Sequence, residues 1–258
     1  MAIVSKLSSE GRDLLAVGKL FPPNNPKLDR LVTFLKTVPG TDKALMFIQY
    51  FSKILIWFFT RIGKKSLAQR IYNLYSPIAD FRILLRYYGL LPLIQWMISI
   101  ENDESLTYSS PLLLNLRRLQ NILMLLYYPL EHTWWLSFHK IIPIPEDLMN
   151  KIGVWSCRFW AIYVLVQFSC SYLEWKIVKR KKLELIKSID FDEKDANSKI
   201  RLRKDHERIV REVFTNIGYF PLTLHWSIPN SIFPEIGEGI FGTIAAYYEL
   251  SGAWKSHS

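Results

Sequence analysis

The chain has 258 residues, of which half are apolar and 14% are aromatic, and its formal net charge is +10. This apolar and aromatic content excludes a disordered chain. A basic chain suggests nucleic acid or an anionic membrane surface as its partner. Many of the cations flank apolar segments and no nucleic-acid-binding module is recognisable, so the membrane is favoured.

Apolar residues recur at helical spacing along the chain. We therefore expect an all-α fold: a membrane-associated helical bundle with an amphipathic helix and one or two marginal transmembrane or hairpin helices. Residues 1–26 are expected to form a flexible leader and residues 27–258 a single helical membrane domain. Asn25 is the expected N-cap of the first helix. A second helix is expected from about residue 41 to residue 62, before Gly63.

The segment from residue 64 to residue 88 carries a narrow apolar stripe with cations along its edges. At about 100° per residue, six apolar side chains fall within roughly 80° of one another on a helix. Such a helix can lie flat on an anionic bilayer, with the stripe among the acyl chains and the cations among the phosphates. The predicted membrane-binding residues are Lys64, Leu67, Arg70, Ile71, Leu74, Ile78, Phe81, Arg82, Leu85 and Arg86.

Two alternatives stay open for this segment. The core helix of a soluble bundle shows the same periodicity, with its stripe buried against neighbouring helices. Pro77 lies inside the pattern, and an interior proline removes a helical hydrogen bond and kinks the axis. One kinked helix or two shorter helices could therefore carry the stripe.

No run of about 18 predominantly apolar residues marks a certain transmembrane helix. The two best candidates are residues 159–173, which carry no charge, and residues 236–254, which include Glu238 and Glu249. Each could cross a bilayer marginally or lie at its surface as part of a hairpin.

Residues 176–212 are densely charged, with thirteen lysines or arginines against eight aspartates or glutamates, a net charge of +5. A solvated helical hairpin or loop explains such a segment. The alternative is a basic cytosolic segment, in which Lys179 and its basic neighbours follow directly on an apolar helix and contact anionic headgroups.

Residues 237–242 match the nucleotide-binding pattern G-x-G-x-x-G. That pattern needs a preceding strand, a following helix and an acidic residue about twenty positions later. Prolines precede the motif here and only sixteen residues follow it, so we exclude a dinucleotide site. Gly239, Gly242 and Ala246 instead indicate a close-packing face of a membrane helix.

No arrangement of residues predicts catalysis, a metal site or a cofactor. The five histidines are scattered, and none belongs to an H-x-x-x-H pair with a neighbouring carboxylate, so zinc is not expected. No nucleophile–histidine–acid arrangement or phosphate-binding loop can be singled out. We therefore expect a protein that is not an enzyme.

Several stretches resemble one protein family. Residues 34–35, 40–43 and 49–51 are similar to the F-L, G-[RT]-[DE]-K and Q-Y-x elements that open the sequences of the peroxisomal biogenesis factor 11 family. Residues 81–86 resemble the S-R-K-x-x-R segment that closes the membrane-active amphipathic helix of that family. Asn216 and residues 221–226 resemble the N-x-x-D-L-P-L-x-x-H-W pattern of its fungal branch.

The resemblance runs in order along nearly the whole chain from about residue 28, with three departures. Met46 stands where an arginine is common in the second helix. The residue before Arg82 is not serine, and Tyr219 replaces the usual acid of the fungal pattern.

The resemblance implies a peroxisomal membrane protein whose termini face the cytosol. Relatives elongate the peroxisome before fission and recruit a dynamin-related GTPase and its membrane adaptor. Expected partners are therefore these two proteins and an anionic phospholipid membrane; a homo-oligomer is also expected, and nucleic acid is not. The main hypothesis is a protein that promotes peroxisome proliferation by inserting the helix of residues 64–88 into the membrane.

Two other functions stay open. Some relatives are credited with pore activity, and a metabolite pore or carrier of the peroxisomal membrane would need polar groups facing a lumen, such as Arg117, Arg118, Glu131 and His132. A soluble helical scaffold that binds a partner helix would be released from membranes by carbonate extraction.

Overall fold

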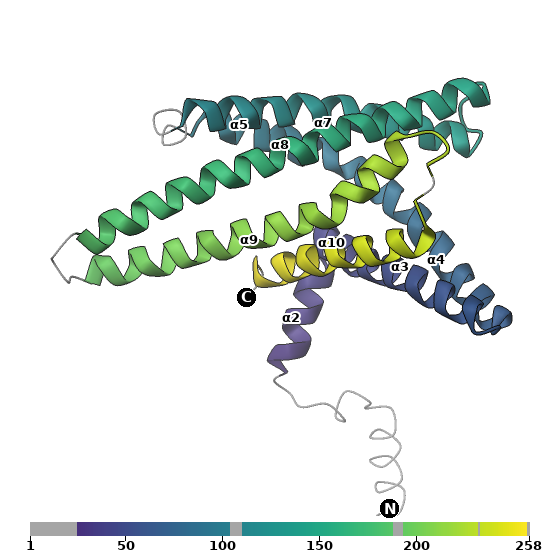
Figure 1. Cartoon of the computed structure of the whole chain (residues 1–258), viewed down its shortest axis with the longest axis horizontal. Helices are drawn as coiled ribbons and strands as arrows, with labels where there is room; N and C mark the ends of the chain where they lie inside the picture. The colour runs from purple at the N-terminus through teal and green to yellow at the C-terminus, as the bar shows by residue number, and fades with distance from the viewer. Residues whose placement is uncertain (1–24, 104–109, 188–192, 232, 257–258) are drawn as a thin grey trace, which may run out of the picture.

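The computed structural model describes residues 25–103, 110–187, 193–231 and 233–256, and these contain helices and no strand (Figure 1). The expected all-α fold is confirmed, while residues 1–24 of the expected leader lie outside the described residues. The helical elements are α2 (Pro26–Leu35), α3 (Val38–Arg61), α4 (Lys65–Leu85), the 3-10 turn η2 (Arg86–Gly89), α5 (Leu90–Glu101), α7 (Pro111–Phe138), α8 (Glu146–Lys187), α9 (Glu193–Ser227) and α10 (Glu235–Ser256).

The helices pack as a series of neighbouring pairs. α3 packs on α4 and α10, α10 on α9, α9 on α8, α8 on α7, and α7 on α5. Figure 1 shows α8 and α9 as a long hairpin, with α5 and α7 side by side along one edge of the molecule. Because α4 continues through η2 into α5, the series closes on itself.

Capping side chains set the helix starts. The Asn25 side chain accepts a hydrogen bond from the Leu28 N–H at 3.1 Å, which confirms the predicted cap. The second helix begins three residues earlier than expected, at Val38, because the Thr37 hydroxyl accepts from the Gly40 N–H at 3.0 Å. Pro39 lies in the first turn, where a missing N–H costs no helical hydrogen bond.

The amphipathic segment is one helix. α4 runs from Lys65 to Leu85 with Pro77 in its interior, and η2 and α5 extend the helical stretch to Glu101. Of the two alternatives that the sequence left open, one helix or two, the structure shows one helix carrying the stripe.

The core lies where α3, α9 and α10 meet. Its buried cluster consists of Met46, Tyr50, Leu222, Ala245 and Ala246. Residues of α10 therefore lie inside the bundle, and two of the three glutamates of this helix form ion pairs with α3. Glu238 pairs with Lys53, and Glu249 with Lys43 at 3.2 Å.

Two segments in the described part of the chain are long and apolar enough to cross a membrane, Lys65–Glu101 and Glu146–Lys187. The second contains the predicted run of residues 159–173. The first takes the place of residues 236–254, which do not qualify. Glu238 and Glu249 lower the mean hydropathy of residues 236–254.

Gly239, Gly242 and Ala246 lie at the contact of α10 with its neighbours. A Cβ atom at Gly242 would lie 2.1 Å from Cδ1 of the buried Tyr50 ring, and one at Gly239 would lie 2.9 Å from Cγ1 of Ile54. Ala246 is fully buried. All three small residues therefore let α10 approach α3 closely.

This contact predicts a difference between two glycines of α10. Gly242→Ala should lower the free energy of unfolding by about 1–3 kcal/mol, because the new methyl group displaces the Tyr50 ring. Gly252→Ala should raise it by up to about 1 kcal/mol, because alanine favours the helix and the nearest atom, Arg211 Nε, is 3.7 Å away. Thermal unfolding of both variants in detergent measures the difference, and equal effects would contradict it.

Candidate functional site

The stripe of α4 is turned partly outward. Leu67, Leu74 and Phe81 are 38%, 55% and 46% exposed, while Ile71 and Ile78 are half-buried. We call Leu67, Leu74 and Phe81 the outer stripe. A soluble bundle would enclose side chains of this size, because burying each is worth about 1.5–3 kcal/mol.

The packing direction of α4 explains this exposure. The residues of α4 that are buried are Ala68 and Arg82. At about 100° per residue, these two positions lie some 60–100° around the helix from Leu67 and Leu85 in the middle of the stripe. α3 therefore covers the edge of the stripe and leaves its other side open.

Arg82 is buried between α4 and α3. Its guanidinium donates to Asp42 Oδ1 at 2.8 Å through Nε and to Gln49 Oε1 at 2.6 Å through Nη1. Burial raises the pKa of Asp42, but the charges of Arg82 and Lys43 lower it further, so the pKa lies below its ordinary value. Asp42, Gln49 and Arg82, which all lie in stretches that resemble the family, are thus in contact around the buried guanidinium.

Arg86 also has a protein partner. Its Nε and Nη2 atoms donate to Glu131 of α7 at 2.8 and 2.6 Å, and the Tyr127 hydroxyl donates to the same carboxylate at 2.6 Å. Arg82 and Arg86 were predicted as cations along the membrane edge, but the structure places both in contacts between helices. Lys64 and Arg70 remain exposed.

Exposed apolar side chains continue beyond the predicted segment. In α5, Leu91, Ile94 and Ile98 recur at helical spacing, and Leu91 and Ile98 are 71% and 57% exposed. On α8, Ile162 and Leu165 are also exposed. Ile162 and Leu165 lie within the predicted run of residues 159–173, whereas the α5 positions were not predicted, although the uncharged run of residues 87–100 was a usable signal.

The basic segment of residues 176–212 is helical where it is described, as the end of α8 and much of α9. Its turn, residues 188–192, lies outside the described residues. Lys176 and the four cations of residues 179–182 are exposed. The helical hairpin is thus seen, while a cytosolic location stays a prediction.

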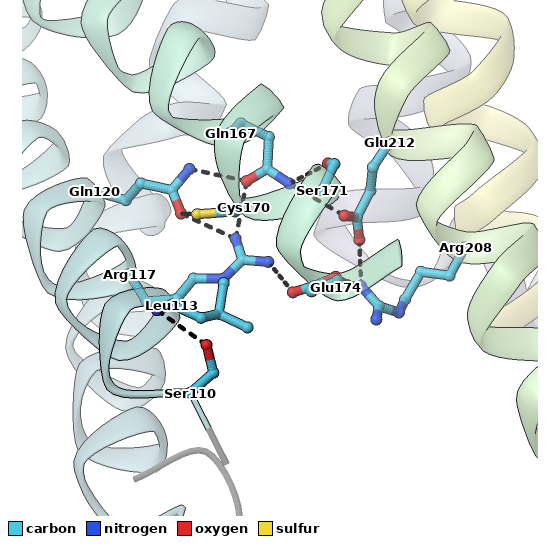
Figure 2. Close-up of polar contacts among 10 residues, drawn as sticks. All are labelled: Ser110, Leu113, Arg117, Gln120, Gln167, Cys170, Ser171, Glu174, Arg208 and Glu212. Atoms are coloured by element: carbon cyan, nitrogen blue, oxygen red, sulfur yellow. Dashed lines mark hydrogen bonds and ion pairs between the residues drawn. The ribbon is translucent and has the colours of Figure 1, made fainter. Parts of the chain in front are cut away.

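A buried polar network joins α7 to α8 (Figure 2). Arg117 donates to Gln120 at 2.9 Å and to Gln167 at 2.8 Å, and it also pairs with Glu174. Gln120, fully buried, donates to Gln167 at 2.8 Å. These contacts satisfy polar groups that would otherwise be costly to bury.

The same network continues to α9. Arg208 donates to Glu174 at 2.9 Å and to Glu212 at 2.8 Å (Figure 2). With Arg117, the network holds two positive and two negative charges. Pairing of this kind offsets much of the desolvation cost of each charge.

The four side chains considered for a pore lie in separate places. Arg117 belongs to the network above, whereas Arg118 is exposed and pairs with Glu101 at 2.7 Å. Glu131 binds Arg86, and His132 stacks on Tyr87 with ring centroids 3.8 Å apart. They face no common opening in the described structure, so a pore stays a prediction without added support.

In the described residues, no group of three or more histidine, cysteine, aspartate or glutamate side chains could hold a metal ion. Cys157 and Cys170 are both free thiols.

Comparison with known proteins agrees with the resemblance. The family model described as Peroxisomal biogenesis factor 11 matches residues 28–254. A protein of Schizosaccharomyces pombe that is described as uncharacterized is 28% identical over 169 residues, which cover 65% of this chain and 65% of that protein. No solved structure matches.

Proposed function

The chain belongs to the peroxisomal biogenesis factor 11 family, and on that basis we propose that it is a peroxisomal membrane protein that elongates the membrane during peroxisome proliferation. The observation that supports this most is the uncovered apolar surface of α4 and α5. Soluble monomers rarely expose apolar patches of more than a few hundred Å². A family of biogenesis factors also fits a protein without an enzymatic role.

We propose membrane insertion of α4 as the mechanism. The outer stripe would enter the acyl region of the cytosolic leaflet, at a gain of about 1.5–3 kcal/mol for each side chain as an upper estimate. Lys64 and Arg70 would each add about 1 kcal/mol at an anionic surface. Insertion into one leaflet expands that leaflet and favours tubules.

The proposed orientation follows from the cations. Basic segments beside apolar helices stay on the cytosolic side, so residues 176–212 and both termini would face the cytosol. The family implies recruitment of a dynamin-related GTPase and its membrane adaptor from that side. A homo-oligomer is part of the same proposal.

Vesicle remodelling tests the proposed function. The purified full chain should convert vesicles of phosphatidylcholine and phosphatidylserine into tubules, and should act much more weakly on phosphatidylcholine alone, because the cations need anionic headgroups. Negative-stain electron microscopy provides the readout. A chain that binds both kinds of vesicle and remodels neither would overturn the mechanism.

Carbonate extraction separates the proposal from a soluble scaffold. We expect the chain to stay in the pellet with peroxisomal membranes at high pH, because its exposed apolar side chains hold it in lipid. A soluble helical scaffold would appear in the supernatant, as a peripheral control protein does. Immunoblotting of both fractions measures the distribution.

A further inference from the structure

A groove lies between α8 and α9, next to the buried polar network. Its volume is about 320 Å³, at the lower end of the range for ligand clefts. Seven of its nine lining side chains are apolar or aromatic, and the other two are Ser171 and His206. The lining includes Phe168, Tyr172, Trp175, Ile209, Val210 and Phe214.

The groove is open to the outside of the helix pair. Tyr172, Val210 and Phe214 are exposed although they line it, so an occupant would cover apolar surface that no other described part of the chain covers. Inside the bundle, Ser171 accepts from Gln167 at 3.3 Å and is itself buried. The groove therefore offers an apolar ligand a continuous wall and few polar groups.

Positive charge is placed beside this apolar wall. Lys176 Nζ lies 4.6 Å from the centroid of the Tyr172 ring, and Lys179 Nζ lies 5.1 Å from that of Trp175. Both rings line the groove. Residues 176–187 carry six lysines or arginines and one glutamate, so this end of α8 has a net charge of 6 − 1 = +5.

The two arginines of the polar network already have carboxylate partners. Arg117 and Arg208 are paired with Glu174 and Glu212 in the buried network. Among the described residues, by contrast, Lys176 and Lys179 have ring contacts and no carboxylate within 4.0 Å. Both ammonium groups are therefore available to an anion at the groove.

We propose that the groove between α8 and α9 binds one anionic glycerophospholipid, with an acyl chain along the apolar wall and the phosphate beside Lys176 and Lys179. This site rests on the proposed membrane location of the chain but not on insertion of α4. An apolar groove beside a cluster of cations matches an amphiphile that carries one negative headgroup. A second copy of the chain is a poorer occupant, because its net charge of +10 would repel these lysines.

Native mass spectrometry of the detergent-purified full chain tests the site. With phosphatidylserine added, we expect a population with one bound lipid, and much less with phosphatidylcholine. Lys176→Gln with Lys179→Gln should lower the affinity for phosphatidylserine about 25-fold, from roughly fivefold for each cation. Lys181→Gln with Lys182→Gln removes the same charge from the same helix and should change it little.

A second pair of variants tests the apolar wall. Val210→Trp should fill the groove and release the lipid, whereas Ile200→Trp, at an exposed position elsewhere on α9, should not. If Val210→Trp fails to fold, the two lysine pairs still decide the question. Equal binding of both lipids, or equal loss in both lysine pairs, would overturn the proposal.

Two further outcomes separate the alternatives. A lipid-free dimer that Val210→Trp disrupts would assign the groove to a second copy and overturn lipid binding. Leu74→Glu with Phe81→Glu should still retain the lipid, because both positions lie on α4. The failure of α4 insertion and the failure of this site are therefore measured independently.

Discussion

Replacing Leu74 and Phe81 with glutamate should abolish the formation of tubules from anionic vesicles. Both side chains are about half exposed, so the folded protein can carry the charges without burying them. In a membrane, each substitution removes about 1.5–3 kcal/mol of apolar burial and places a carboxylate among acyl chains or anionic headgroups. Co-sedimentation with vesicles and electron microscopy measure binding and tubules.

The matched control places the same charges on the opposite side of α4. Gln69→Glu with Asn73→Glu adds two carboxylates to an exposed polar face, and tubules should still form. Circular dichroism should show the same helix content in both double variants. If both pairs of substitutions behave alike, overall charge rather than the outer stripe drives membrane binding, and the insertion mechanism is wrong.

The sequence predicted the stripe of α4 but not which of its edges faces protein. Periodicity fixes the angles between side chains on one helix, and so it grouped Leu67 with Leu74 and Phe81 correctly on one face. It contains no information on the direction from which a neighbouring helix packs. Arg70 and Arg82 looked equivalent as cations beside a stripe, and only tertiary contacts distinguish them.

Two of the departures from the family pattern, at positions 46 and 219, are in contact in the structure. Met46 and Tyr219, which differ from the family pattern, lie together: the Tyr219 hydroxyl donates to Met46 Sδ at 3.5 Å. An arginine and an acid at these positions would also be neighbours. A single sequence does not show that two positions 173 residues apart are in contact, so it could not predict that both members of this pair are replaced together.

In α7, local sequence rules explain where the helix begins, but not which partners its interior polar side chains bind. The cap at Ser110 follows from local rules, and the Leu113 N–H donates to its side chain at 3.4 Å. Whether Arg117 faces a lumen or a carboxylate depends on Glu174 of α8, 57 residues away. The pore hypothesis named residues whose partners only the folded chain shows.

Replacing Arg82 with methionine should destabilise the protein by about 3–5 kcal/mol, because it leaves the partly buried Asp42 carboxylate without its main partner. Gln49 loses a hydrogen bond as well. At a few degrees per kcal/mol, the midpoint of thermal unfolding should fall by roughly 10 °C. Arg70→Met, at an exposed position of the same helix, should change stability by less than about 0.5 kcal/mol.

Membrane binding should respond in the opposite way. Arg70→Met should weaken binding to anionic vesicles about fivefold, the value of one surface cation, and folded Arg82→Met should bind nearly as the natural chain does. Equal losses of stability in the two variants would mean that Arg82 is not held by α3. Equal losses of membrane affinity would mean that it reaches the lipid after all.

Acid should remove the stability difference between the natural chain and Arg82→Met. The pKa of Asp42 is lowered in the folded state, so its contribution is present above its unfolded pKa, near about 4, and is lost as the pH falls through the folded value. Below that pH a neutral carboxyl group no longer needs the guanidinium. The two unfolding midpoints should therefore converge in acid, and a constant gap down to low pH would place the source of the stability elsewhere than in this ion pair.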